Sequence, residues 1–200
     1  MATAVIPGVS LAIVHTNDIW QGQWGVMNAS TSQPFTAETA FQAASLSKPV
    51  FAYAVLQLVV AKQLDLDTPL VTYLPGGLQT SDLLFDHIVN EPNLHKITAR
   101  HVLSHTPGFP NWAKKDEKLK TSFAPGTRFS YSGEGYQFLQ RVVEQIVGQP
   151  AHDWIRKVLL TPLGMRKASF TAAKTDEHVA FGHDKTGQPA DFWEIPQMGA

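Results

Sequence analysis

A serine and a lysine three positions apart are the residues of this chain best suited to nucleophilic chemistry. Ser45 and Lys48 lie in the segment Ala-Ser-Leu-Ser-Lys-Pro at positions 44–49. On a helix, residues three apart share a face, and free N–H groups at the helix start favour negative charge. A hydroxyl beside an amine at such a place has the parts of an activated acyl-transfer nucleophile. A second interpretation stays open on these residues alone: Ser45 only caps the helix, and Lys48 extends to solvent.

The element that must position this pair is the apolar run from Val50 to Ala61, in which Gln57 is the only clearly polar residue. A helix that is apolar nearly all round is a buried one, so we expect the central helix of a domain. Pro49 lacks an N–H and is tolerated near a helix start, which places that start close to Ser45.

The rest of the chain predicts strands at its two ends and helices in its middle, which is an α+β pattern. Residues 8–15 indicate a buried strand, joined by a turn to a second strand at 19–27, and together they form a hairpin. Thr98 is expected to cap the helix that follows it. The other predictions are a turn at Gly76–Gly77, helices over 98–104, 137–147 and 154–160, a helix end at Gly148, and strand and turn structure beyond Phe170.

Composition limits the classes of function. The chain has 200 residues, a formal net charge of −1 and no cysteine. We therefore expect one domain, no nucleic-acid partner, and neither disulfides nor thiol chemistry. No apolar run is long enough to cross a bilayer, and no signal pattern precedes Val5, which favours the cytoplasm unless a leader has been removed.

Metal and cofactor chemistry find little support in the sequence. His101 and His105 are four residues apart on a predicted helix, which is a possible metal-ligand spacing. No acidic residue accompanies them as in the H-E-x-x-H pattern, and no glycine-rich phosphate loop is present. We expect the protein to bind no metal and to work without a cofactor.

Several blocks, taken in order, resemble the serine β-lactamase and penicillin-binding-protein superfamily. The similarity is to its group of class C β-lactamases, D,D-peptidases and related esterases. The blocks are residues 7–14, 45–48, 64–67, 97–108, 125–127 and 131–133. The resemblance implies a β-lactamase/transpeptidase-like fold, in which a helical region accompanies an antiparallel sheet that this chain supplies only in part. It also implies a single domain over 1–200, incomplete at its C-terminus. Its parts are a hairpin at 8–27, a helical region at 45–165, and a turn and strand segment at 166–200.

The same resemblance assigns roles to individual residues. Ser45 matches the acylated serine, Lys48 the lysine that helps to deprotonate it, and Tyr131 the tyrosine of the family's Y-x-N motif. Either Lys48 or Tyr131 can be the base that activates the serine. The backbone N–H of Ser45 should form half of an oxyanion hole. Gly133 stands at the substrate-binding position where the family usually has asparagine. The loss of that amide favours an esterase or a broad hydrolase.

The family's third motif is a Lys-Thr-Gly or His-x-Gly on an edge strand, and it supplies the other oxyanion N–H. Lys185-Thr186-Gly187 matches its letters but lies in a turn-forming cluster with Asp184, Gln188 and Pro189, so we predict a hairpin turn. The catalytic strand then lies outside this chain. Either the chain is a fragment, or a second chain completes the sheet, for example by strand exchange.

Two functions from different classes therefore remain. The first is a cofactor-free serine hydrolase that acts on small-molecule ester, amide or β-lactam substrates through an acyl-enzyme on Ser45. A D,D-peptidase acting on cell-wall peptides is a special case of it. The second is a catalytically incomplete fragment, or a non-catalytic member of the family, that keeps the fold as a binding module.

Overall fold

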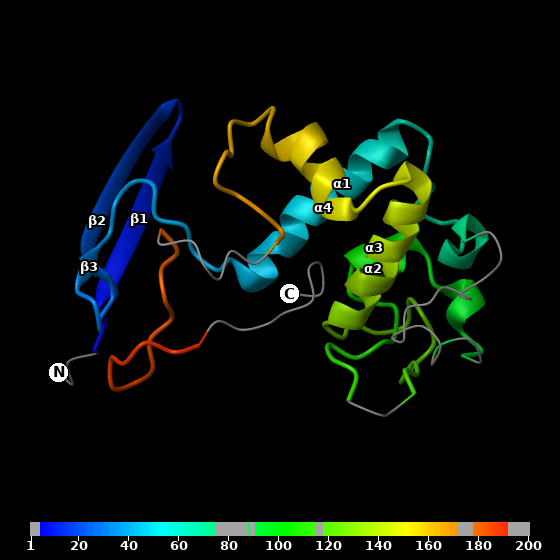
Figure 1. Ribbon diagram of the computed structural model, residues 1–200. Helices are drawn as coiled ribbons and strands as arrows, with labels where there is room; N and C mark the ends of the chain where they lie inside the picture. The colour runs from blue at the N-terminus through cyan, green and yellow to red at the C-terminus, as the bar shows by residue number, and fades with distance from the viewer. Residues whose placement is uncertain (1–4, 75–87, 89–90, 115–117, 172–177, 192–200) are drawn as a thin grey trace. The chain divides into compact units, whose positions relative to one another are not determined.

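The computed structural model describes residues 5–74, 88, 91–114, 118–171 and 178–191 (Figure 1). The chain divides into two compact units, which we describe separately. Unit 1 combines the two ends of the chain, residues 1–43 and 171–194, as far as these are described. Unit 2 is formed by residues 44–170, again as far as these are described. The single-domain organisation therefore stays a prediction. The predicted turn at Gly76–Gly77 lies outside the described residues.

Unit 1 is built on a three-stranded antiparallel sheet of order β1-β2-β3 (Figure 1). The strands are β1 (Gly8–His15), β2 (Asp18–Asn28) and β3 (Gln33–Pro34), which confirms the predicted hairpin and adds a short third strand. The late segment of the chain joins this unit. The N–H of Phe181 donates to the carbonyl of Met27 (2.9 Å), and Val179 forms a parallel bridge with Ala40.

The expectation that the first strand is buried was wrong, because seven of its eight residues are exposed. Its odd-numbered residues share a sheet face with their partners on β2. This apolar sheet face consists of Val9, Leu11, Ile13, Trp20 and Trp24, whose exposed fractions run from 44% to 53%. Burial requires a second layer over the sheet, and the described residues of unit 1 do not provide one here.

Unit 2 is helical. Its elements are η1 (Ala44–Leu46), α1 (Ser47–Val60), η2 (Leu70–Tyr73), η3 (Leu94–Lys96), α2 (Ala99–Leu103), α3 (Gly133–Val147), α4 (Ala151–Ile155) and the π-helical turn η4 (Arg156–Leu160). Its core includes Phe51 of α1, Phe109 of the loop after α2 and Phe138 of α3, all fully buried. The predicted helix near 154–160 is thus present as α4 and η4.

The helix α1 begins where Pro49 predicted, but it is not buried all round. Phe51, Val55 and Leu58 face the core, whereas Tyr53 and Val60 are 54% and 79% exposed. An apolar sequence permits burial on every side, but packing supplies it only where another element covers the helix. The described part of unit 2 covers one face.

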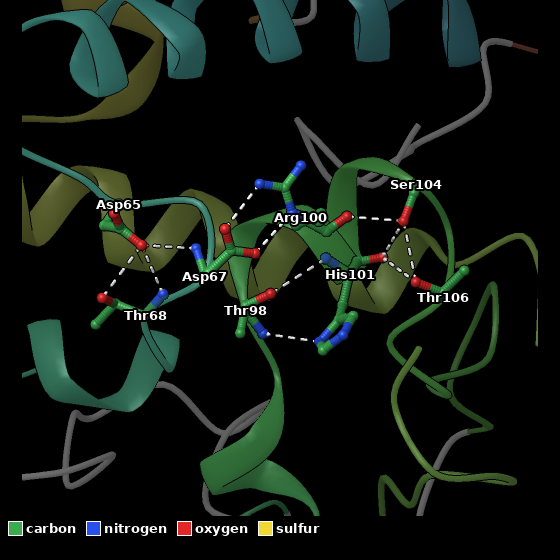
Figure 2. Close-up of polar contacts among 8 residues, drawn as sticks. All are labelled: Asp65, Asp67, Thr68, Thr98, Arg100, His101, Ser104 and Thr106. Carbon is green, nitrogen blue, oxygen red and sulfur yellow. Dashed lines mark hydrogen bonds and ion pairs between the residues drawn. The ribbon is translucent and has the colours of Figure 1, made fainter. Parts of the chain in front are cut away.

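Thr98 caps α2 as predicted, and Figure 2 shows the polar contacts around this helix start. The His101 N–H donates to Thr98 Oγ1, and the Thr98 N–H donates to His101 Nδ1, both at 3.3 Å. One residue before His101, the Arg100 guanidinium donates two hydrogen bonds to the Asp67 carboxylate, at 2.6 and 2.7 Å. These contacts fix the loop before η2 against the start of α2, the helix that leads to the loop at His105.

The helix α3 begins four residues earlier than its pattern predicted and ends, as predicted, at Gly148, whose φ is +67°. Glycines at 133 and 135 disfavour a helix by propensity. Packing overrides that preference: a Cβ on Gly135 would lie 2.9 Å from Ser132 Oγ and 3.0 Å from Pro107 Cγ. Ser132 caps the helix by accepting the Gly135 N–H at 3.0 Å. None of the described helices combines the length and the apolar content needed to span a bilayer.

Candidate functional site

Ser45 and Lys48 lie together at the start of α1. Ser45 is the middle residue of η1 and is exposed, whereas Lys48, in the first turn of α1, is only 4% exposed. Lys48 Nζ donates a hydrogen bond to Ser45 Oγ at 3.3 Å. The capping interpretation is therefore wrong: the N-cap of α1 is Leu46, without a side-chain hydrogen bond, and Lys48 is buried. An accessible hydroxyl in contact with a buried amine is suited to nucleophilic attack.

The backbone just before Ser45 is strained. Ala44 has φ of +44°, in the left-handed region that L-residues other than glycine, asparagine and aspartate rarely adopt. Strain of this kind persists only where the surrounding structure imposes it, and it is concentrated at functional sites. Here it directs the chain through the tight η1 turn that presents Ser45.

Tyr131, the third candidate, lies against Lys48. Lys48 Nζ is 5.0 Å from the centroid of the Tyr131 ring and 5.6 Å from that of Tyr136, so two aromatic rings contact one cationic side chain. The Tyr131 side chain is partly accessible (37% exposed), whereas Tyr136 is buried. Burial, with a further contribution from Tyr131, raises the pKa of Tyr136 to about 12, which keeps that phenol neutral. Through Lys48, the structure brings Ser45 and Tyr131 to one place.

Gly133 lies two positions after Tyr131, as the first residue of α3, and is buried. Ser132, the N-cap of that helix, is the only residue between Gly133 and Tyr131 in the sequence. A direct contact of Gly133 with substrate stays a prediction.

Sequence reasoning missed His105 as a part of this site. Its imidazole stacks on the rings of Tyr131 and Tyr136, with centroids 4.2 and 5.1 Å away. Its Nδ1 accepts the N–H of Ser132 at 3.1 Å. The available signal was its place in the His-Thr-Pro-Gly segment after α2, but its partners lie 26 to 31 positions later and cannot be read from local pattern.

The pair of His101 and His105 is engaged in other contacts. Each Nδ1 atom accepts a backbone N–H, from Thr98 and from Ser132 respectively. Within the described ranges, no three His, Asp or Glu side chains gather as metal ligands would. That the protein binds no metal or cofactor stays an expectation.

Lys185-Thr186-Gly187 forms the predicted hairpin turn. A bridge between His183 and Pro189 closes it, and Gly187 has φ of +82°. Asp184 Oδ1 accepts the N–H groups of Thr186 and Gln188 at 2.8 and 3.0 Å, which fixes the turn. These three residues therefore do not form an edge strand.

Comparison with known proteins gives one family. The family model described as "Beta-lactamase" matches residues 1–198. The chain is 29% identical to esterase EstB of Burkholderia gladioli over 96% of its own length and 55% of that enzyme. It is 30% identical to penicillin-binding protein 4 of Amycolatopsis lactamdurans, over 95% of this chain and 53% of that protein.

The fold is also found among solved structures. A class C β-lactamase in complex with cefoxitin superposes with a TM-score of 0.78 at 27% identity, over 97% of this chain and 55% of that one. The chain thus spans about half the length of the curated relatives and of the solved structure that it matches.

Proposed function

Because the chain belongs to the Beta-lactamase family, we propose that it is part of a serine hydrolase that cleaves esters or amides through an acyl-enzyme on Ser45. The predicted fold class, α+β and β-lactamase/transpeptidase-like with a partial antiparallel sheet, is confirmed by the structural match. One observation carries the proposed activity: the buried Lys48 amine lies 3.3 Å from the exposed Ser45 hydroxyl.

In the proposed acylation, Ser45 Oγ attacks the carbonyl carbon of the substrate while its proton passes to Lys48 Nζ, which must act as the neutral amine. The tetrahedral intermediate then collapses, the bond to the alcohol or amine breaks, and the leaving group takes up the proton. Water hydrolyses the acyl-Ser45 ester, which releases the acid and restores the hydroxyl.

Tyr131 has two possible parts in this scheme. Its ring lies against Lys48, so its hydroxyl can relay the proton to the leaving group or act as the base itself. The N–H of Ser45 is the proposed first donor of the oxyanion hole. Lys185-Thr186-Gly187 forms a turn, so the second donor must come from another segment.

Esters are the substrates that we favour. Gly133 presents no side-chain amide where the family pattern has asparagine, and such an amide would recognise the acylamino group of a peptide or a β-lactam. Among the relatives, one is named an esterase, others are named penicillin-binding protein and D-aminopeptidase, and all of these names fit acyl transfer.

The turn at Lys185-Thr186-Gly187 favours a second candidate function. Without a third motif on a strand, the described residues hold only part of the catalytic apparatus. The chain would then be a binding module of the same fold, with no turnover of its own.

We also propose a protein partner, which is a second chain that completes the sheet. Among the described strands, β1 pairs with β2 alone, so its other edge is open. The apolar sheet face beside that edge is exposed and would be covered by such a partner.

Covalent labelling tests the proposed function. Ser45 should displace fluoride from a fluorophosphonate, forming an Oγ–P bond, and intact-protein mass spectrometry should find one adduct that peptide mapping places on Ser45. Ser45→Ala should abolish the adduct and Lys48→Ala should slow its formation by about 100-fold or more, the loss expected for a general base.

Ser47→Ala is the matched control, because Ser47 is the other serine of the same motif and is the first residue of α1. It should label like the parent chain. An adduct that persists in Ser45→Ala would contradict the nucleophile assignment. A folded parent chain without an adduct would favour the binding-module function instead.

A further inference from the structure

His105 holds both chain neighbours of Tyr131. The His105 carbonyl accepts the N–H of Ser130 at 2.8 Å, and His105 Nδ1 accepts the N–H of Ser132 at 3.1 Å. One residue thus fixes the backbone on either side of Tyr131, from a position 26 residues earlier in the chain.

The same residue also constrains the Tyr131 side chain. The two rings stack with centroids 4.2 Å apart and an interplanar angle of 26°. The Tyr131 side chain is 37% exposed, so it would otherwise retain rotamer freedom. The His105 backbone itself has φ of +55°, an unfavourable conformation that its surroundings impose.

We propose that His105 is a positioning residue, which as a neutral imidazole keeps Tyr131 in place against Lys48 for proton transfer. This inference rests on the proposed hydrolase function. It follows from the contacts of the ring: an Nδ1 that accepts a hydrogen bond carries no proton, so the neutral ring must carry its proton on Nε2.

Protonation of His105 would undo this arrangement. A proton on Nδ1 replaces the acceptor that Ser132 requires and places a positive charge near the Lys48 amine. The titratable groups that contact or act on the ring are Lys48 of α1, Tyr131 before α3 and Tyr136 of α3. Burial, followed by the charge of Lys48, lowers the pKa of His105, which extends the neutral form toward acidic pH.

The test is a double-mutant cycle on the rate of fluorophosphonate labelling of Ser45. His105→Asn keeps a hydrogen-bond acceptor and tolerates positive φ, but it removes the stacked ring. It should slow labelling about tenfold or more, because small misplacements of a catalytic group have effects of this order. In a Tyr131→Phe background, the same substitution should change the rate less than about twofold, since the hydroxyl that His105 positions is already absent.

His101→Asn is the matched control, because His101 also accepts a backbone N–H through Nδ1 one turn earlier. It should lower thermal stability without slowing labelling below its unfolding temperature. Equal slowing by His101→Asn, or additive effects of His105→Asn and Tyr131→Phe, would overturn the positioning role and leave the hydrolase proposal intact. A parent chain that takes up no label would overturn both.

A second readout follows the imidazole itself. Nitrogen NMR of the parent chain should find the Nε2–H tautomer of His105, with a titration midpoint below the ordinary value of a histidine, because burial and the charge of Lys48 lower its pKa. An Nδ1–H tautomer would contradict the proposal directly, whatever the labelling rates.

Discussion

At the scale of single residues, the site depends on two polar side chains that differ in their exposure to solvent. Lys48 is nearly inaccessible while its partner Ser45 is open to solvent. Residue type and spacing were enough to select Ser45 and Lys48 as candidates, and the resemblance to the family added Tyr131. The strain at Ala44 and the contacts of His105 were not predictable, because both depend on segments that meet only after folding.

The strain at Ala44 makes a prediction about stability. Ala44→Gly should stabilise unit 2 by up to about 1 kcal/mol, because glycine adopts positive φ without the steric cost that alanine pays, and this gain exceeds the entropy that glycine loses on folding. Urea denaturation would measure the difference. Ala43→Gly, at a neighbouring alanine whose φ is not positive, should instead be neutral or destabilising. Equal effects of the two substitutions would show that Ala44 is not strained.

At the scale of elements, the helix boundaries marked by cap residues were the easiest to predict. Thr98 and Gly148 mark boundaries through cap chemistry that is local in sequence. The start of α3 was missed because Gly135 packs closely against Pro107, which no local pattern shows. The short β3 and the π-helical turn after α4 also leave no periodic signal.

The junction of α3 and α4 depends on Glu144. Its carboxylate accepts hydrogen bonds from Gln140 (3.0 Å), Arg141 (2.8 Å) and the N–H of Ala151 (3.1 Å). Burial acts to raise the pKa of Glu144, but these hydrogen bonds outweigh it and hold the pKa below its usual range. A lowered pKa means that the carboxylate stabilises the folded state above the unfolded pKa, and that this stability is lost as the pH falls through the folded value.

Glu144→Gln should therefore reduce the free energy of unfolding by about 1–2 kcal/mol at neutral pH. The difference from the parent chain should begin to shrink as the pH falls below the unfolded pKa of a glutamate, about 4.3, and should be lost once the pH has fallen through the lowered folded pKa, where the parent carboxyl is protonated as well. Urea denaturation at several pH values would show this. Asp153→Asn, which removes an exposed carboxylate of α4, should change stability by less than about 0.5 kcal/mol. A pH-independent loss in Glu144→Gln would contradict the assignment.

At the scale of the whole molecule, the fold class followed from the order of several weak blocks, each of which alone is common. The extent of burial could not be predicted in the same way. The sequences of β1 and α1 are apolar enough for a core, yet each element has exposed apolar side chains in the described structure. Sequence patterns report what a segment is able to bury. They do not report which element covers it, and the relatives that the chain matches are about twice as long as this chain.

The apolar sheet face predicts self-association. Ile13→Lys places a charge in the middle of that face and should lower the weight-average mass in sedimentation equilibrium, because contiguous exposed apolar patches drive association. Ser10→Lys adds the same charge on the opposite face of β1, and we expect it to leave the mass unchanged. If both variants are as associated as the parent chain, the apolar sheet face is not the contact.

The pairing of Met27, Ala29 and Ala40 with residues 178–183 also determines when unit 1 can form during synthesis. The N–H of Ala29 bonds to His183, 154 residues later, so the hairpin leaves the ribosome long before its partner segment exists. At about 5–20 residues per second, that wait lasts roughly 8 to 30 seconds. Throughout it, the tryptophan-bearing hairpin is a nascent segment without its tertiary partner, and it is open to chaperones and proteases.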